Sequence, residues 1–155
     1  MTRTIALVAA LLCSPLAARA ADQKLTAAQV PEAVMTAVKT QYASAKQLGW
    51  SKEVEKGKTE YEAKLDNGLE VTVSPEGKIL SEESEIAFEQ IPEAARQAFA
   101  ASKYGKWKVR KAEKIVEGDK TSFEIAAHEG KAGIEVVLDA QGKILREERT
   151  AAKGD

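Results

Sequence analysis

Apolar and polar side chains alternate along much of this chain with the two-residue period of β-strands that bury one face. Residues 60–65 read Glu-Tyr-Glu-Ala-Lys-Leu and residues 69–73 read Leu-Glu-Val-Thr-Val, so each segment has its apolar side chains on one face. The residues between them are Asp66-Asn67-Gly68, and Asn and Gly tolerate the positive φ angles of a tight hairpin turn. The pattern predicts two antiparallel strands joined by that turn.

The same alternation predicts further strands in both halves of the chain. We expect them at residues 50–55, 60–65, 69–74 and 78–84 in the first half, and at residues 106–116, 123–127, 134–138 and 144–145 in the second. The second-half hairpin that corresponds to residues 66–68 is expected to have the longer loop, from His128 to Gly133.

A helix is predicted before each set of strands. Pro31 and Pro92 each precede such a segment, and proline is favoured at the first helical position because its missing N–H would have no partner there. Apolar residues then recur with helical spacing, at Val34, Ala37, Val38 and Tyr42 in the first half and at Ala95, Ala98 and Phe99 in the second. We expect both apolar stripes to pack into the core.

The two halves have matching sequences in the same order. Residues 30–34 (VPEAV) match 91–95 (IPEAA), 59–62 (TEYE) match 121–124 (TSFE), 68–71 (GLEV) match 133–136 (GIEV), and 77–83 (GKILSEE) match 142–148 (GKILREE). Four collinear matches indicate a duplicated unit of about 60 residues.

The predicted fold is therefore α+β, with two tandem repeats that each pack one helix on a four-stranded antiparallel sheet. The predicted boundaries are a flank at 21–29, a first repeat at 30–85, a linker at 86–90, a second repeat at 91–150 and a tail at 151–155. Because a unit of this size is marginally stable alone, we expect the repeats to share an interface or to join their sheets.

The first twenty residues have the pattern of a secretory signal peptide. Arg3 supplies a positive charge, residues 5–12 are apolar, and Ala18-Arg19-Ala20 has small residues at the positions that a signal peptidase reads. The apolar run is too short for a membrane span, which needs about 20 apolar residues. We predict cleavage between Ala20 and Ala21, and a periplasmic or secreted protein with no stable membrane insertion.

Cleavage changes the composition that matters for function. The full chain of 155 residues has one Cys, one His, 23 basic and 24 acidic residues. Loss of Arg3, Cys13 and Arg19 leaves 21 basic and 24 acidic residues and no cysteine. A zinc site or cysteine catalysis is therefore not expected, and the charge balance argues against a nucleic-acid partner.

The remaining candidates for chemistry are few. His128 falls at a predicted hairpin, where an exposed turn residue is the preferred interpretation, and no nucleophile can be assigned to it. The acidic runs at 82–85 and 147–148 lack the alternating carboxylates and central Gly of a calcium loop. The ten glycines are scattered at turns rather than gathered in a phosphate-binding loop. We predict no catalytic residue, metal site or cofactor, and no enzymatic activity.

Several of these motifs resemble one family of exported bacterial domains. An apolar residue followed by Pro-Glu-Ala at a helix start, a strand with an aromatic residue and Glu, and a last strand that begins Gly-Lys-Ile-Leu are similar to the PepSY-like family. The chain looks like two such domains in tandem, from residue 30 to residue 150. The resemblance also extends to the fold of the secreted β-lactamase inhibitor protein, and it implies a binding or inhibitory role at the cell envelope.

The two predicted repeats differ in charge, with 7 basic and 11 acidic residues at 30–85 against 12 and 10 at 91–150. The basic excess is concentrated at 103–111 (KYGKWKVRK), which is interpreted either as a solvated strand face or as a docking site. The candidate partner-binding residues are Glu60, Glu62, Glu70, Lys106, Lys108, Arg110, Ser122, Glu124 and Glu135.

These observations predict an exported binding protein that acts by steric contact through its exposed sheet face and hairpins. The expected partner is a protein at the cell envelope, with a peptidase or another envelope enzyme as the candidate. The alternative is a periplasmic module that binds a small molecule or an ion, in a pocket between helix and sheet or at the acidic strand ends.

Overall fold

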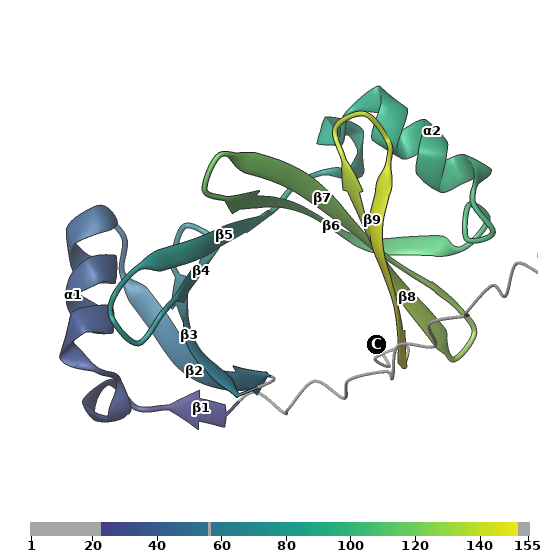
Figure 1. The fold of residues 1–155 in the computed structure, drawn as a ribbon. Coiled ribbons are helices and arrows are strands. Elements are labelled where there is room, and N and C mark those ends of the chain that lie inside the picture. Colours follow the sequence, from purple (N-terminus) through teal and green to yellow (C-terminus); the bar gives the residue numbers. More distant parts are fainter. Residues whose placement is uncertain (1–22, 56, 152–155) are drawn as a thin grey trace, which may run out of the picture.

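The strands of this protein form one continuous antiparallel sheet (Figure 1). The structure is a computed structural model that describes residues 23–55 and 57–151. Within this part of the chain the sheet has nine strands, which are neighbours in the same order as in the sequence, from β1 to β9. The predicted signal peptide and its cleavage site lie outside the described residues.

The elements follow one another along the chain with short connections. They are β1 (Gln23–Leu25), the 3-10 helix η1 (Ala27–Gln29), α1 (Glu32–Gln41), β2 (Gln47–Glu55), β3 (Lys58–Leu65), β4 (Leu69–Val73), β5 (Ile79–Glu85), the 3-10 helix η2 (Phe88–Gln90), α2 (Glu93–Ala101), β6 (Lys108–Glu117), β7 (Lys120–Glu129), β8 (Ala132–Asp139) and β9 (Ile144–Ala151). We call the part from β1 to β5 the N-terminal half and the part from η2 to β9 the C-terminal half.

The predicted fold class, two repeats that each have their own four-stranded sheet, is wrong. β5 pairs with β6 from Glu82↔Val116 to Glu85↔Glu113, so the strands of both halves belong to one sheet. Pairing at this joint satisfies backbone N–H and C=O groups that two separate sheets would expose at their edges. The predicted flank adds a further strand, because β1 pairs with β2.

Both α-helices cover the same face of this sheet, and each lies over one core (Figure 1). The helical spacing predicted from the sequence places Val34 and Val38 of α1, and Ala95 and Phe99 of α2, in these cores. The N-terminal core also contains Val30, Trp50, Tyr61, Ala63, Leu65, Val71 and Val73, and the C-terminal core contains Ile91, Tyr104, Ala112, Phe123, Ile125, Ala127, Ile134, Val136 and Leu138. Among the described residues, no helix is long and apolar enough to cross a membrane.

In each half, one hairpin turn lies directly against the first turn of the helix. A Cβ atom at Gly77 would be 2.7 Å from the backbone oxygen of Ala33, and one at Gly142 would be 2.6 Å from that of Ala94. Both glycines also have positive φ angles, of 86° and 87°. Because other residues rarely adopt this conformation and have no room here, glycine lets the turn between the last two strands of each half contact its helix.

A tyrosine that follows each helix is bonded to a glutamate on the last strand of the same half. The hydroxyl of Tyr42 donates a hydrogen bond to Glu82, and that of Tyr104 donates to Oε2 of Glu147 at 3.2 Å. Burial, together with the hydrogen bond to Glu82, raises the pKa of Tyr42 above its ordinary value. These two bonds connect the end of each helix to the sheet.

The predicted long loop from His128 to Gly133 is wrong. β7 extends to Glu129 and β8 begins at Ala132, so only Gly130 and Lys131 form the turn. His128 pairs with Gly133 and is a half-buried strand residue rather than an exposed turn residue. The additional residues of this half lengthen the strands, because each added pair contributes backbone hydrogen bonds that a loop would leave to water.

Candidate binding surface

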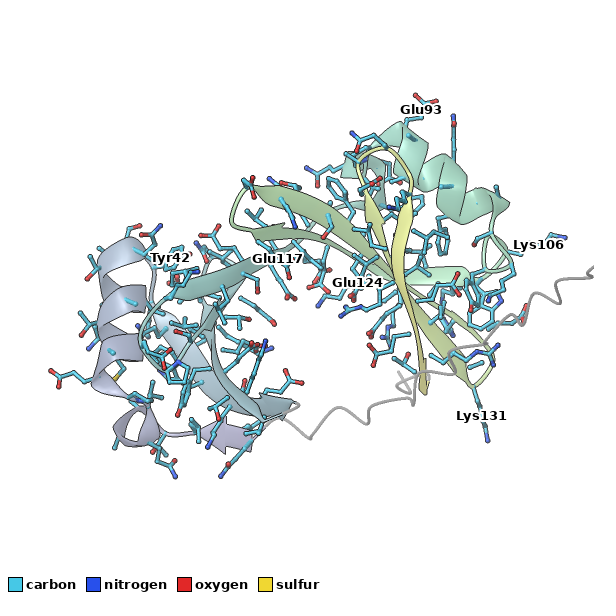
Figure 2. All side chains as sticks on the ribbon, viewed as in Figure 1. Tyr42, Glu93, Lys106, Glu117, Glu124 and Lys131 are labelled. Carbon is cyan, nitrogen blue, oxygen red and sulfur yellow. The ribbon has the colours of Figure 1, made fainter. Side chains whose placement is uncertain are left out.

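The face of the sheet opposite the helices is concave and carries mostly charged side chains (Figures 1 and 2). Residues that pair across neighbouring strands lie on the same face, so the register defines its members. We call it the concave face, and it includes Ser51, Glu53, Glu60, Glu62, Lys64, Glu70, Thr72, Ser81, Glu83, Glu85, Lys108, Lys111, Glu113, Ile115, Ser122, Glu124, Ala126, His128, Glu135, Val137, Arg146 and Glu148.

Five glutamates on five successive strands meet where the two halves join. They are Glu62 on β3, Glu70 on β4, Glu83 on β5, Glu113 on β6 and Glu124 on β7. Burial, followed by repulsion from the carboxylates of Glu113, Glu124, Glu62 and Glu70, raises the pKa of Glu83 to about 7. We call these residues the joint cluster. It exists because β5–β6 pairing brings together acidic residues from both halves.

Basic side chains neutralise four members of the joint cluster. Lys64 Nζ lies 2.7 Å from Oε1 of Glu70 and 3.7 Å from Oε1 of Glu62, Lys111 Nζ lies 2.7 Å from Oε1 of Glu113, and Arg146 Nη2 lies 3.3 Å from Oε2 of Glu124. Within the described part of the chain, Glu83 has no such ion pair, which leaves its charge the least compensated of the five.

The concave face also has a small apolar centre in the C-terminal half. Ile115, Ala126 and Val137 are 8%, 4% and 6% exposed, although they lie on the side away from α2 and outside the core beneath it. Long charged side chains on neighbouring positions bury apolar groups beneath their stems while their charged ends stay in water. The surface therefore combines a charged array with an apolar spot.

Most of the predicted candidate residues share this surface. Glu60, Glu62, Glu70, Lys108, Ser122, Glu124 and Glu135 all lie on the concave face. Lys106 does not, because it lies in the turn before β6 and its side chain extends away from the sheet (Figure 2). Whether any of these residues contacts a partner stays a prediction.

Alternation along the sequence also assigns Arg110 to the concave face, and this assignment is wrong. The register of β6 with β7 shifts between Val109 and Lys111, so Arg110 is the extra residue of a β-bulge. Lys111 takes the position on the concave face that alternation assigns to Arg110, and it pairs with Glu113. Alternation along the sequence does not single out Lys111, Glu83, Glu113 or Arg146, because their positions on this face depend on the bulge and on the joint between the halves.

The groups needed for metal binding do not converge on this surface. No set of three or more His, Cys, Asp or Glu side chains in the described residues is placed to hold a metal ion. The acidic run at 82–85 is divided by the strand, since Glu82 faces α1 and bonds to Tyr42 whereas Glu83 faces the other side.

A family model described as "Putative beta-lactamase-inhibitor-like, PepSY-like" matches this chain twice, at residues 18–81 and at residues 81–146. The chain belongs to this PepSY-like family. The resemblance predicted from its motifs is confirmed, including the tandem arrangement. The comparison with curated proteins gave no match.

Solved structures share the fold of this PepSY-like protein at low sequence identity. A BLIP-like protein from Bacteroides fragilis is 24% identical, with a TM-score of 0.61 over 81% of this chain and 90% of that chain. A DUF2874 family protein from Bacteroides uniformis is 15% identical, with a TM-score of 0.60 over 77% and 88%. A protein from Bacteroides eggerthii, described as a putative periplasmic protein, is 17% identical, with a TM-score of 0.60 over 77% and 88%.

Proposed function

We propose that this PepSY-like protein is an exported binding protein that holds a protein partner against its concave face. The observation that supports this most directly is the arrangement of the sheet. Both α-helices lie on one face, so the described elements leave the opposite face uncovered (Figure 1). An antiparallel sheet with one uncovered polar face is stable in water and is also available for recognition.

The chemistry of the concave face favours a partner with a protruding basic segment. Acidic side chains outnumber basic ones across it, and Glu113, only 8% exposed, shows that some are already partly desolvated. Lysine or arginine side chains from a partner would compensate Glu83, whose charge is opposed by its neighbours.

Two comparisons support a periplasmic location and action by binding. The predicted signal peptide and the periplasmic description of the Bacteroides eggerthii neighbour favour a periplasmic location. The family description, beta-lactamase-inhibitor-like, favours a steric inhibitor or regulator of an envelope enzyme such as a peptidase. Action by binding rather than by catalysis also fits the residues present, because carboxylates paired with Lys and Arg dominate the concave face.

Charge reversal on the concave face tests this proposal. The mature protein is immobilised and exposed to periplasmic extract of its own host, and the wild type is compared with a variant that carries Glu60→Lys and Glu135→Lys, one change in each half. We expect the wild type to retain one partner in stoichiometric amount and the variant to lose it. Glu32→Lys on α1 is the matched control on the helix face, and it should retain the partner.

Circular dichroism first verifies that each variant is folded. Recovery of the same partner by all three proteins would contradict the concave face as the binding surface. Failure of the wild type to retain any partner would contradict the binding function itself.

A further inference from the structure

A groove on the helix side of the C-terminal half is lined by aromatic side chains and an arginine, unlike the mostly acidic concave face. It has a volume of about 490 Å³ and lies between α2, η2 and the start of β6. This is within the range of about 300–1,000 Å³ that is typical of small-molecule sites. Its lining includes Phe88, Phe99, Trp107, Arg96 and Gln97.

Aromatic side chains form its apolar walls. Phe88 and Phe99 are in edge-to-face contact with ring centroids 6.5 Å apart. Trp107 is in turn held edge-to-face against Tyr104, with centroids 5.1 Å apart. Phe99 is anchored in the core, whereas Phe88 and Trp107 are half-buried, so rigid rings remain accessible from the groove.

One cation is fixed in the groove next to these rings. Nε of Arg96 donates a hydrogen bond to the backbone oxygen of Ile91 at 3.0 Å, which orients the guanidinium. No acidic side chain of the described residues lies within ion-pair distance of it, and its other N–H donors are therefore available to an anion. Glu93 also lines the groove, and its Oε1 accepts a hydrogen bond from Nε2 of Gln97 at 2.9 Å.

The duplication shows that the fold does not require this combination of residues. When the two Pro-Glu-Ala helix starts are aligned, Arg96 corresponds to Met35 and Phe88 to Ala27. When Tyr42 and Tyr104, which each bond to a glutamate, are aligned, Trp107 corresponds to Ala45. The N-terminal half thus has the same elements without the cation and without two of the aromatic rings. Phe88 and Trp107 also pack against the C-terminal core, so Arg96 is the member of this set whose presence in one half packing does not explain.

We propose that this groove binds a small free carboxylate with an aromatic or branched apolar body. The apolar body lies between Phe88 and Trp107, and the carboxylate accepts hydrogen bonds from the terminal nitrogens of Arg96. Arginine matches a carboxylate well because its donors form a planar fork. The site is on the helix side of the sheet, so it is separate from the concave face and does not depend on the function proposed above.

The two tryptophans allow a direct test by NMR. The indole N–H signals of the mature protein are followed at pH 7.5 during titration with N-acetyl-L-phenylalanine and, separately, with its uncharged amide. We expect a saturable shift of the Trp107 signal with the carboxylate, and at least tenfold weaker binding of the amide. Trp50, in the other half and 7% exposed, is the internal reference and should not move. Trp107→Phe assigns the signals.

Variants test whether the Arg96 guanidinium binds the carboxylate. Arg96→Gln should weaken binding of the carboxylate about tenfold and remove its advantage over the amide, because a charged hydrogen-bond donor is lost. Lys39→Gln on α1 removes one positive charge from the other half and should leave binding unchanged. If Arg96→Gln fails to fold, Phe88→Ala serves as the second variant and should also weaken binding.

Three results of these titrations would overturn the proposal, and a peptide titration can give a fourth. They are the absence of a saturable Trp107 shift, equal binding of the carboxylate and the amide, and unchanged binding in folded Arg96→Gln. A fourth arm uses a peptide that ends in phenylalanine with a free carboxylate. Binding of that peptide without binding of N-acetyl-L-phenylalanine would show that the site takes a chain terminus and would overturn the assignment to a small free ligand.

Discussion

Replacement of Glu83 by glutamine should stabilise the protein above neutral pH. The pKa of this carboxyl is raised from 4.5 to about 7 in the folded state, by burial first and then by Glu113, Glu124, Glu62 and Glu70. The folded protein therefore binds the Glu83 proton more tightly than the unfolded chain does. Its contribution to the free energy of unfolding falls as pH rises from about 4.5 to about 7, and it is constant at higher pH.

The magnitude follows from the difference between the two pKa values. About 1.4 kcal/mol for each pKa unit gives roughly 3 kcal/mol without solvent screening. Because the side chain is half-buried, screening reduces this to about 1–2 kcal/mol. Glutamine keeps the size of the side chain and cannot ionise, so Glu83→Gln should gain about 1–2 kcal/mol of stability at pH 8 and less at pH 5.

Urea unfolding monitored by circular dichroism measures this gain at both pH values. All other titrating groups are common to the two proteins, so the difference between them reports the ionisation of Glu83 together with its repulsion of Glu62, Glu70, Glu113 and Glu124. The matched control is Glu148→Gln, which changes the corresponding glutamate on the edge strand β9 and should alter stability by less than about 0.5 kcal/mol. A gain that is equal at pH 5 and pH 8, or no gain at pH 8, would refute the argument from the joint cluster.

Two further predictions concern the folded core. Leu138→Ala, at a fully buried position beneath α2, should reduce the free energy of unfolding by about 2–5 kcal/mol in urea titrations, and a loss below 1 kcal/mol would contradict the packing described for it. Gly77→Ala should cost at least about 1–2 kcal/mol more than Gly118→Ala, because both positions have positive φ but only Gly77 approaches the backbone of Ala33. Equal losses in the two glycine variants would contradict that close approach.

Local patterns were sufficient to predict the helices and most of the strands. Alternation identified β3 and β4 together with the turn between them, and the Pro-Glu-Ala motifs located the start of both helices to within a residue. These features depend on neighbours in sequence, which the pattern of residues records directly. The duplication supports each predicted element because the same signals occur twice in the same order.

The features that were left open or predicted wrongly depend on contacts between distant residues or on a single backbone irregularity. Pairing of β5 with β6 joins segments about 30 residues apart in the sequence. The sequence of each strand alone fits an edge strand as well as an interior strand. The bulge at Arg110 adds one residue to β6, which changes the face of Lys111 without any glycine or proline to mark it. The turn of Gly130 and Lys131 is shorter than the predicted loop from His128 to Gly133, because β7 and β8 extend to Glu129 and from Ala132.

The joint between the halves has the largest consequence for the proposed binding function. In two separate sheets, Glu83 and Glu113 would lie on different edges, each with water on one side. In one sheet they lie on the same concave face beside Glu70 and Glu124, and the desolvation and repulsion that raise the pKa of Glu83 result from this. The property that most favours a cationic partner is therefore absent from either repeat alone and arises from the β5–β6 pairing that the sequence left open.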